Sequence, residues 1–182
     1  MSVLMDSEFE SLLREDLPHF DLTTLYLGIS EERSIARLVA RSRGVLAGVE
    51  EAVAVYEKTD ASAECLLRNG SEVVEGSVVL EAEERASALH ATWKVAQVLV
   101  SYVSGVATYT RLMVEAERRV NPKVVVATTR QTPPGSRKLW LRAVLAGGGV
   151  VHRQSLSEEI LLFKIHLLFA GGRGAKRGGE VR

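Results

Sequence analysis

The alternation of hydrophobic and polar residues predicts that the chain begins with short helices and strands. Residues 6–16 place apolar side chains at helical spacing, and Pro18 ends that helix because proline cannot continue it. Residues 34–41 alternate apolar and polar side chains as a half-buried strand does. A short apolar run between glycines follows at 44–48, and residues 49–57 again have helical spacing.

Two more apolar runs, 63–67 and 72–82, predict a β-hairpin. They are joined through Asn69-Gly70, a dipeptide that tolerates the positive φ of a tight hairpin turn. With the preceding strand they predict a small α/β domain whose sheet is mostly antiparallel. Cys65, the single cysteine, lies in the first run and is expected to be a buried thiol, and one cysteine excludes an internal disulfide framework.

A long helix is predicted from Glu83 to about Val120. Most of its faces are apolar, but polar residues recur at every third or fourth position and form one narrow stripe. The stripe consists of His90, Lys94, Gln97, Ser101, Ser104, Thr108 and Arg111. It is either a solvated edge or the wall of a site or a dimer seam. Gly105 predicts a kink or a break in this helix.

After Asn121-Pro122 the pattern changes to alternating strands and helices. The apolar run 123–129 predicts a buried parallel strand, residues 137–146 a short helix closed by Gly147-Gly148-Gly149, and 160–169 a second buried strand. Such alternation is how an α/β barrel or an open α/β sheet begins. Functional groups on those folds follow the carboxyl ends of the strands.

Composition limits the classes of function. The chain has 182 residues, of which 46% are hydrophobic, so it can bury a core. Basic and acidic residues number 23 each, so the net charge favours neither nucleic acid nor an anionic membrane surface as a partner. The first ten residues lack the features of a signal peptide, and the longest apolar region, 95–107, is too short to span a bilayer. We therefore expect a cytoplasmic protein.

One segment, 128–153, concentrates positive charge within this neutral chain. Its cationic residues are Arg130, Arg137, Lys138, Arg142, His152 and Arg153. Cations that follow a strand indicate an anionic ligand, although a solvated loop would have the same composition. The four histidines lack HxH or HxxxH spacing, and with one cysteine the sequence predicts no metal site.

Five stretches carry a family resemblance: 21-DLTT-24, 44-GVLAG-48, 104-SGVAT-108, 128-TTRQTPPGSRKLWLRAVLAGGGVVHR-153 and 163-FKIH-166. In order and spacing they resemble the quinolinate phosphoribosyltransferase family, in particular its ModD branch of pyrophosphorylases associated with molybdenum transport. The similarity covers residues 6–169. The resemblance implies an α+β N-terminal sandwich domain over residues 1–110, which includes the long helix. It also implies the start of a seven-stranded α/β (TIM-like) barrel over 111–169.

The family pattern continues beyond this chain. The barrel is therefore expected to be incomplete, and residues 170–182, rich in glycine and basic residues, are expected to form a flexible tail.

The resemblance also implies an activity. The family transfers the phosphoribosyl group of phosphoribosyl pyrophosphate, in the presence of Mg²⁺, to an anionic nitrogen heterocycle and releases pyrophosphate. With quinolinate as the acceptor, this is a reaction of NAD biosynthesis. The resemblance further implies a homodimer or a higher oligomer. The implied substrate-binding residues are Arg130, Gln131, His152, Arg153 and Lys164. Weaker candidates are Thr129, Arg137, Lys138, Tyr102 and His166, and no residue is assigned as catalytic or as a metal ligand.

Two departures from the family pattern concern the substrate. Gln131 stands where the family has a lysine, and Tyr102 stands where the quinolinate enzymes have an arginine that crosses the dimer interface. Two functions therefore stay open. One is a ModD-like phosphoribosyltransferase with an unidentified acceptor, and the other is a non-catalytic family member that acts as a dimerising or assembly module.

Overall fold

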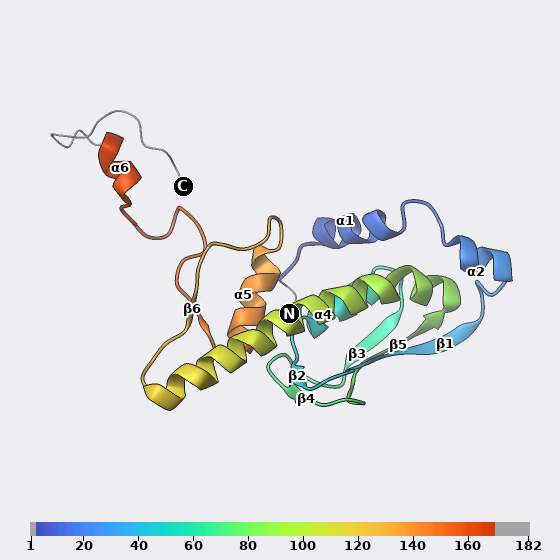
Figure 1. The fold of residues 1–182 in the computed structure, drawn as a ribbon. Coiled ribbons are helices and arrows are strands. Elements are labelled where there is room, and N and C mark those ends of the chain that lie inside the picture. Colours follow the sequence, from blue (N-terminus) through green and yellow to red (C-terminus); the bar gives the residue numbers. More distant parts are fainter. Residues whose placement is uncertain (1–2, 170–182) are drawn as a thin grey trace. The chain divides into compact units, whose positions relative to one another are not determined.

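A computed structural model describes residues 3–169, which fall into two compact units (Figure 1). The first unit ends at His152 and the second begins at Arg153. The elements of the first unit are, in chain order, α1 (Asp6–Asp16), α2 (Leu22–Leu27), β1 (Arg33–Val39), β2 (Gly44–Val45), α3 (Val49–Glu57), β3 (Ser62–Cys65), β4 (Glu72–Val73), β5 (Val78–Arg85), α4 (Ala86–Val120), β6 (Ala127–Thr128), α5 (Arg137–Ala146) and β7 (Val150–Val151).

The first two helices begin where carboxylates accept hydrogen bonds from free backbone N–H groups. Glu8 accepts a bond of 2.8 Å from the N–H of Met5 at the start of α1. Asp21 accepts bonds from two N–H groups in the first turn of α2. The helix predicted over 6–16 is confirmed and ends before Pro18.

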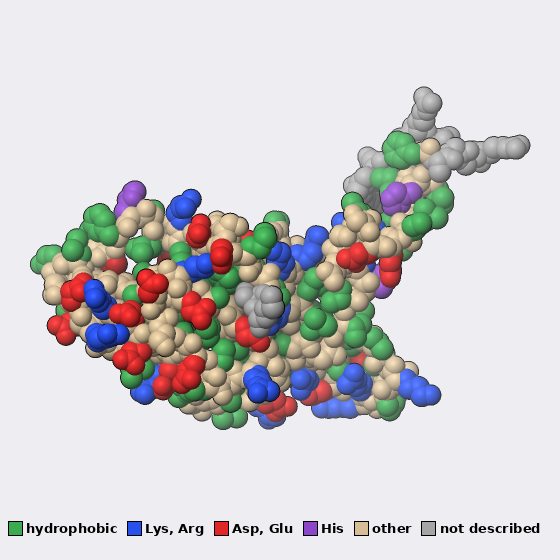
Figure 2. Space-filling view, turned by 180° about the vertical axis from the view of Figure 1, so that it is seen from behind, with side chains coloured by type: hydrophobic (Ala, Val, Ile, Leu, Met, Phe, Trp, Pro, Cys, Tyr) green, Lys and Arg blue, Asp and Glu red, His purple; other side chains and the backbone are tan. Residues whose placement is uncertain are grey.

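The main sheet is antiparallel and has the strand order β1-β5-β3, which confirms the predicted sheet type. Leu80 and Ala82 on β5 are buried, whereas the opposite face of the sheet carries charge. Arg37 on β1 pairs with Glu81 on β5 across this face. Figure 2 shows basic and acidic side chains interspersed over this region. The sheet therefore turns one face to the core and the other to solvent, as alternating strands require.

The predicted hairpin is confirmed in part, because β3 of the first run pairs antiparallel with β5 of the second run. Asn69-Gly70 forms the predicted tight turn, in which Gly70 has a positive φ of 89° and the N–H of Ser71 bonds to the carbonyl of Arg68. The turn does not join the paired strands directly, because the N–H of Gly70 bonds to the carbonyl of Leu46 and β4 follows it. The run 72–82 also divides in two at Gly76, whose φ is 86°. The first piece, β4, pairs with β2, and the second, β5, joins the main sheet. Alternation of apolar residues does not reveal which neighbour a strand will pair with.

The long helix α4 lies against α3, β2, β5 and α5, and much of the core forms along it. Five of its apolar residues that face this core are Leu89, Ala96, Leu99, Val103 and Ala107. The helix runs unbroken through Gly105, so the predicted break is wrong. A helical glycine costs about 1 kcal/mol relative to alanine, and the packing of buried residues on both sides of it outweighs that cost.

The later part of the first unit contains a parallel pair of very short strands. Ala127 lies opposite Val150 and Thr128 opposite Val151. The parallel direction predicted for the run 123–129 is therefore present, but the predicted burial is wrong, because Val125 is 62% exposed. A strand is buried on both faces only where helices cover both faces. The helix predicted over 137–146 is confirmed and is closed by the three glycines that follow it.

In the second unit the run 160–169 does not form the predicted buried strand. Residues 164–169 form the helix α6 (Lys164–Phe169), and Ile160 and Phe163 are exposed. A short apolar run fits a strand or a helix equally well. The helix satisfies its backbone groups locally, whereas a strand needs a neighbour. The predicted tail, 170–182, lies outside the described residues.

Two other predictions concern Cys65 and membranes. Cys65 is exposed, so the expected buried thiol is wrong. It lies on β3, which within residues 3–169 pairs with β5 alone and thus forms an edge of the sheet. Within residues 3–169 no helix combines the length and the apolar character that crossing a bilayer requires.

Ion pairs fix α5 to the helices of the preceding part of the chain. The Nε of Arg142 lies 3.0 Å from Oε1 of Glu51, a residue of α3 that is fully buried. A second nitrogen of Arg142 bonds to Glu50 at 3.0 Å. Lys138 bonds to Glu8 of α1 at 2.6 Å. Lys138 and Arg142, two cations of the basic segment 128–153, therefore hold α5 in place.

We predict that Arg142→Met destabilises the fold by about 3 kcal/mol, because it leaves the buried carboxylate of Glu51 without its cation. The double variant Glu51→Gln, Arg142→Met removes both charges and should recover most of that loss. Urea unfolding measures both free energies. A single variant as stable as the wild type would show that the ion pair contributes nothing to α5 docking.

We also predict a pH-dependent contribution from Glu8. The hydrogen bond from Lys138 and the bond from the Met5 N–H hold the pKa of Glu8 below its ordinary value of 4.5. Because the folded-state pKa is lowered, the stabilisation is present above the unfolded-state pKa and disappears as the pH falls through the folded-state pKa. Glu8→Gln should therefore cost up to about 1 kcal/mol near neutral pH and nothing in acid. Urea midpoints at several pH values test this, and an equal loss at every pH would contradict it.

Candidate functional site

The carboxyl ends of β6 and β7 bring several predicted residues together. Because the two strands are parallel and Thr128 lies opposite Val151, Thr129 and His152 leave the pair at the same end. Arg130 and Gln131 follow Thr129 directly. We call Thr129, Arg130, Gln131 and His152 the strand-end site.

Backbone bonds shape the turn that carries Arg130. The N–H of Gln131 donates to Oγ1 of Thr129 at 3.2 Å, and the N–H of Thr132 donates to the carbonyl of Arg130 at 3.0 Å. Hydroxyl groups of threonine favour such local turns over an extended strand. This accounts for the end of β6 at Thr128, one residue before the end of the predicted run 123–129.

Arg130 has the environment of a ligand-binding cation. The residue is half-buried, and its Nε is buried without a hydrogen-bond partner among the described residues. Buried polar groups of this kind are rare, because a missing partner costs about 1–3 kcal/mol. His152 is exposed at the same strand end. The strand-end site therefore has, at one end of the strand pair, a guanidinium with an unsatisfied N–H and residues that carry an imidazole, an amide and a hydroxyl.

The cations of the basic segment 128–153 that lie on α5 have other roles. Lys138 and Arg142 form the ion pairs of α5, and Arg137 is the exposed first residue of that helix. Arg130 therefore belongs to the strand-end site, whereas Arg137 and Arg142 lie on α5. The packing of that helix decides which elements its side chains face. Sequence proximity cannot distinguish these roles.

Three candidate residues belong to the second unit. Arg153 is buried, and its guanidinium donates to the carbonyls of Ser155 at 2.8 Å and Leu156 at 3.4 Å. Lys164 is the first residue of α6. His166 accepts the N–H of Phe163 at 2.9 Å, which satisfies a free backbone group at the start of α6. Arg153 and His166 therefore have local structural partners.

Tyr102, the remaining candidate, lines a different cavity. It is 38% exposed and borders a crevice of about 310 Å³ between α1, α4 and the start of α5. The other lining residues are Leu12, Glu15, Asp16, Lys94, Val95, Val98, Leu99, Ser136 and Leu139. This crevice is mostly apolar and has no arginine, so it does not resemble a phosphate site.

The polar stripe of α4 is largely structural. Ser104 exchanges hydrogen bonds with the N–H and carbonyl of Ala47, and Thr108 accepts the N–H of Val45 at 2.8 Å. These bonds satisfy the backbone around β2, which pairs only briefly with β4. Over this half of the helix Ser104 and Thr108 therefore hold the backbone around β2. Together with Gln97 and Ser101 they also form a wall of a cavity of about 460 Å³ that Arg41 and Arg43 border.

The other half of the stripe contains a contact that the sequence did not reveal. Nδ1 of His90 lies 2.5 Å from Oγ1 of Thr24, and that hydroxyl also donates to the carboxylate of Asp21. The bond from Thr24 contributes most to holding the pKa of Asp21 below its ordinary value. This network fixes α2 on α4.

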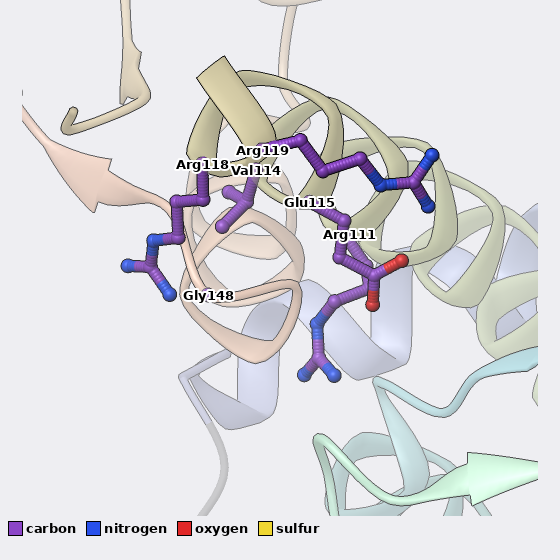
Figure 3. A pocket seen from close by; sticks show the side chains of 6 residues that line it. All are labelled: Arg111, Val114, Glu115, Arg118, Arg119 and Gly148. Atoms are coloured by element: carbon purple, nitrogen blue, oxygen red, sulfur yellow. The ribbon is translucent and has the colours of Figure 1, made fainter. Parts of the chain in front are cut away.

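A basic cavity with a volume of about 600 Å³ lies near the end of α4 (Figure 3). Arg111, Arg118 and Arg119 border it, but Figure 3 shows their guanidinium groups pointing in different directions. Arg111 donates to the carbonyls of Gly147 at 3.0 Å and Ala146 at 3.4 Å, so it caps the end of α5. Arg118 and Arg119 lie in the last turn of α4, where cations stabilise the helix dipole. Divergent groups cannot hold one anion.

The glycines after α5 are a helix cap. Gly148 has a φ of 89°, its N–H bonds to Leu145, and the N–H of Gly149 bonds to Val144. These amides are used internally and leave no cradle for a phosphate. A Cβ on Gly147 would lie 2.5 Å from the carbonyl of Ala107, so the close packing of α5 on α4 requires glycine there.

Comparison with known proteins places this geometry in a family. The models of the quinolinate phosphoribosyl transferase N-terminal and C-terminal domains match residues 21–104 and 106–176. A pyrophosphorylase ModD from Rhodobacter capsulatus is 42% identical over 94% of this chain and 66% of its own length. A nicotinate-nucleotide pyrophosphorylase (carboxylating) from Archaeoglobus fulgidus is 37% identical over 85% of this chain and 58% of its own.

Solved structures agree with these sequence relatives. NadC from Streptococcus pyogenes has a TM-score of 0.82 and 28% identity, and it covers 91% of this chain and 60% of its own. The chain thus spans less than two thirds of the length of the relatives named here, and no closed barrel is present within residues 3–169. On the two domain models, the sequence identities and the shared fold, the chain belongs to the quinolinate phosphoribosyl transferase family.

Proposed function

We propose that the chain acts in a ModD-like phosphoribosyltransferase (pyrophosphorylase) reaction. A phosphoribosyl group passes from phosphoribosyl pyrophosphate to a nitrogen of an anionic heterocycle, and pyrophosphate leaves. Arginine would hold the carboxylates of this heterocycle. The observation that supports this best is the unpartnered Nε of Arg130 at the common end of two parallel strands. The relatives named as pyrophosphorylases supply the reaction class.

The residues of the strand-end site suit binding more than covalent catalysis. A guanidinium binds phosphate or carboxylate through two parallel N–H groups, which suits Arg130 to an anionic ligand. Gln131 and Thr129 offer neutral hydrogen-bonding groups, and His152 can donate to an anion from an exposed position. Displacement at a ribosyl carbon that bears positive charge needs alignment of the two reactants, which such groups provide.

The described residues do not by themselves form a Mg²⁺ site. Mg²⁺ prefers carboxylate and phosphate oxygens, and none of the four residues of the strand-end site is acidic. In the described part of the chain no three His, Cys, Asp or Glu side chains are placed to share a metal ion. In this proposal Mg²⁺ enters as part of the phosphoribosyl pyrophosphate complex, and no step is assigned to a resident metal.

One observation favours the alternative of a non-catalytic dimerising or assembly module. Lys138 and Arg142 are used in ion pairs and Arg153 in a loop, so fewer cations serve an anion than the sequence suggests. Under either proposal we expect a homodimer or a higher oligomer. The two functions differ in one measurable property, which is whether the folded chain binds phosphoribosyl pyrophosphate.

We predict that the chain binds Mg²⁺–phosphoribosyl pyrophosphate saturably and that Arg130→Ala weakens this binding tenfold or more, about 1.4 kcal/mol or greater. Arg130→Lys should recover only part of the affinity, because a lysine cannot form two parallel hydrogen bonds. Isothermal titration calorimetry measures all three dissociation constants.

Lys138→Ala is the matched control, because it removes a nearby cation that the structure uses to bind Glu8. It should lower stability slightly and leave the affinity unchanged. Folded wild-type protein that fails to bind would reject the enzymatic proposal and favour the assembly module. Equal losses in the Arg130 and Lys138 variants would reject the strand-end site.

A further inference from the structure

The side chain of Thr128 connects α5 to the strand-end site. Its Oγ1 accepts a hydrogen bond from the indole Nε1–H of Trp140 at 3.2 Å. The same hydroxyl donates to the carbonyl of Thr129 at 3.3 Å. A hydroxyl has one proton to donate and lone pairs to accept with, so the two bonds are compatible and form one directed relay.

The relay ends at the peptide group that precedes Arg130. The carbonyl of Thr129 belongs to the peptide bond between Thr129 and Arg130, and this group is planar. A bond to its oxygen therefore also fixes the orientation of the N–H of Arg130. The bonds to the N–H groups of Gln131 and Thr132 hold the other side of the turn.

The first member of the relay is itself held firmly. Trp140 is half-buried on α5, between Lys138 and Arg142 in sequence. Those two residues join α5 to α1 and α3 through their ion pairs. The indole is a large side chain with few rotatable bonds, so fixing α5 also fixes the position of its N–H. The donor is thus anchored by the fold and not by the turn that it orders.

We infer that Trp140 is a positioning residue for Arg130 and that it acts through the hydroxyl of Thr128. This inference rests on the proposed function, because it assumes that Arg130 binds an anion. Trp140 itself does not touch the ligand. Its hydrogen bond keeps the Arg130 turn in one conformation before binding, which lowers the ordering cost of binding.

Thr128→Val and Thr128→Ser form a matched pair for testing the relay. Valine keeps the shape of threonine and removes the hydroxyl, whereas serine keeps the hydroxyl. Thr128→Val and Trp140→Phe should each weaken Mg²⁺–phosphoribosyl pyrophosphate binding about three- to tenfold, as expected for one hydrogen bond. Thr128→Ser should retain the wild-type affinity. The double variant Thr128→Val, Trp140→Phe should bind the ligand about as tightly as whichever single variant has the lower affinity, because both changes break the same relay.

Fluorescence provides a readout that general destabilisation would not reproduce. The chain has two tryptophans, so Trp93→Phe leaves Trp140 as the only indole reporter. The ammonium nitrogen of Lys94 lies over the Trp93 ring, 5.3 Å from the ring centroid, and Trp93 takes no part in the relay. In this background Thr128→Val should shift the Trp140 emission maximum without ligand, and Thr128→Ser should not.

The outcomes separate this inference from the proposed function. If the wild-type chain does not bind the ligand, the proposed function fails, and the inference about Arg130 fails with it. If the wild type binds, Arg130→Ala weakens binding, and Thr128→Val binds as the wild type does, then the proposed function stands and the positioning role is rejected. An emission maximum that is the same in the valine and wild-type forms would also reject the relay.

Discussion

The ion pair between Arg142 and Glu51 is the interaction on which the arrangement of the first unit depends. Glu51 is fully buried on α3, and Arg142 reaches it from α5, 91 positions later in the chain. A buried carboxylate is tolerated only when a cation and hydrogen-bond donors compensate it, and the N–H of Val3 supplies one such donor at 3.0 Å. The pair therefore requires α5 to dock in one position on α3, next to the long helix α4.

The position of α5 in turn determines what surrounds the strand-end site. α5 connects β6 to β7, and its docking sets where the two strands can meet. The strands are only two residues long, so their own hydrogen bonds cannot hold this geometry alone. Lys138 and Trp140 add contacts from α5 to Glu8 and Thr128. The helix thus supports the turn that carries Arg130.

This arrangement divides a cluster of cations between structure and binding. Lys138 and Arg142 neutralise acids on α1 and α3, whereas Arg130 keeps a buried Nε without a partner among the described residues. A cation that already compensates a buried acid cannot also bind a ligand without exposing that acid. The proposed anion site is therefore smaller than the basic segment of the sequence, and its specificity depends on how rigidly a few groups are held.

The sequence by itself determined the long helix, α1, α3, α5 and the mostly antiparallel character of the sheet, because each element has a strong apolar period or a clear terminating residue. It also placed Arg130 after a strand and, through its motifs, indicated the family. Only the tertiary structure decided the partners. It paired β4 with β2, exposed Cys65 at a sheet edge, formed a helix at 164–169, and assigned Arg142 to Glu51. The physical reason is that periodicity reports which side of an element is apolar, whereas pairing, edges and ion pairs depend on residues distant in the chain.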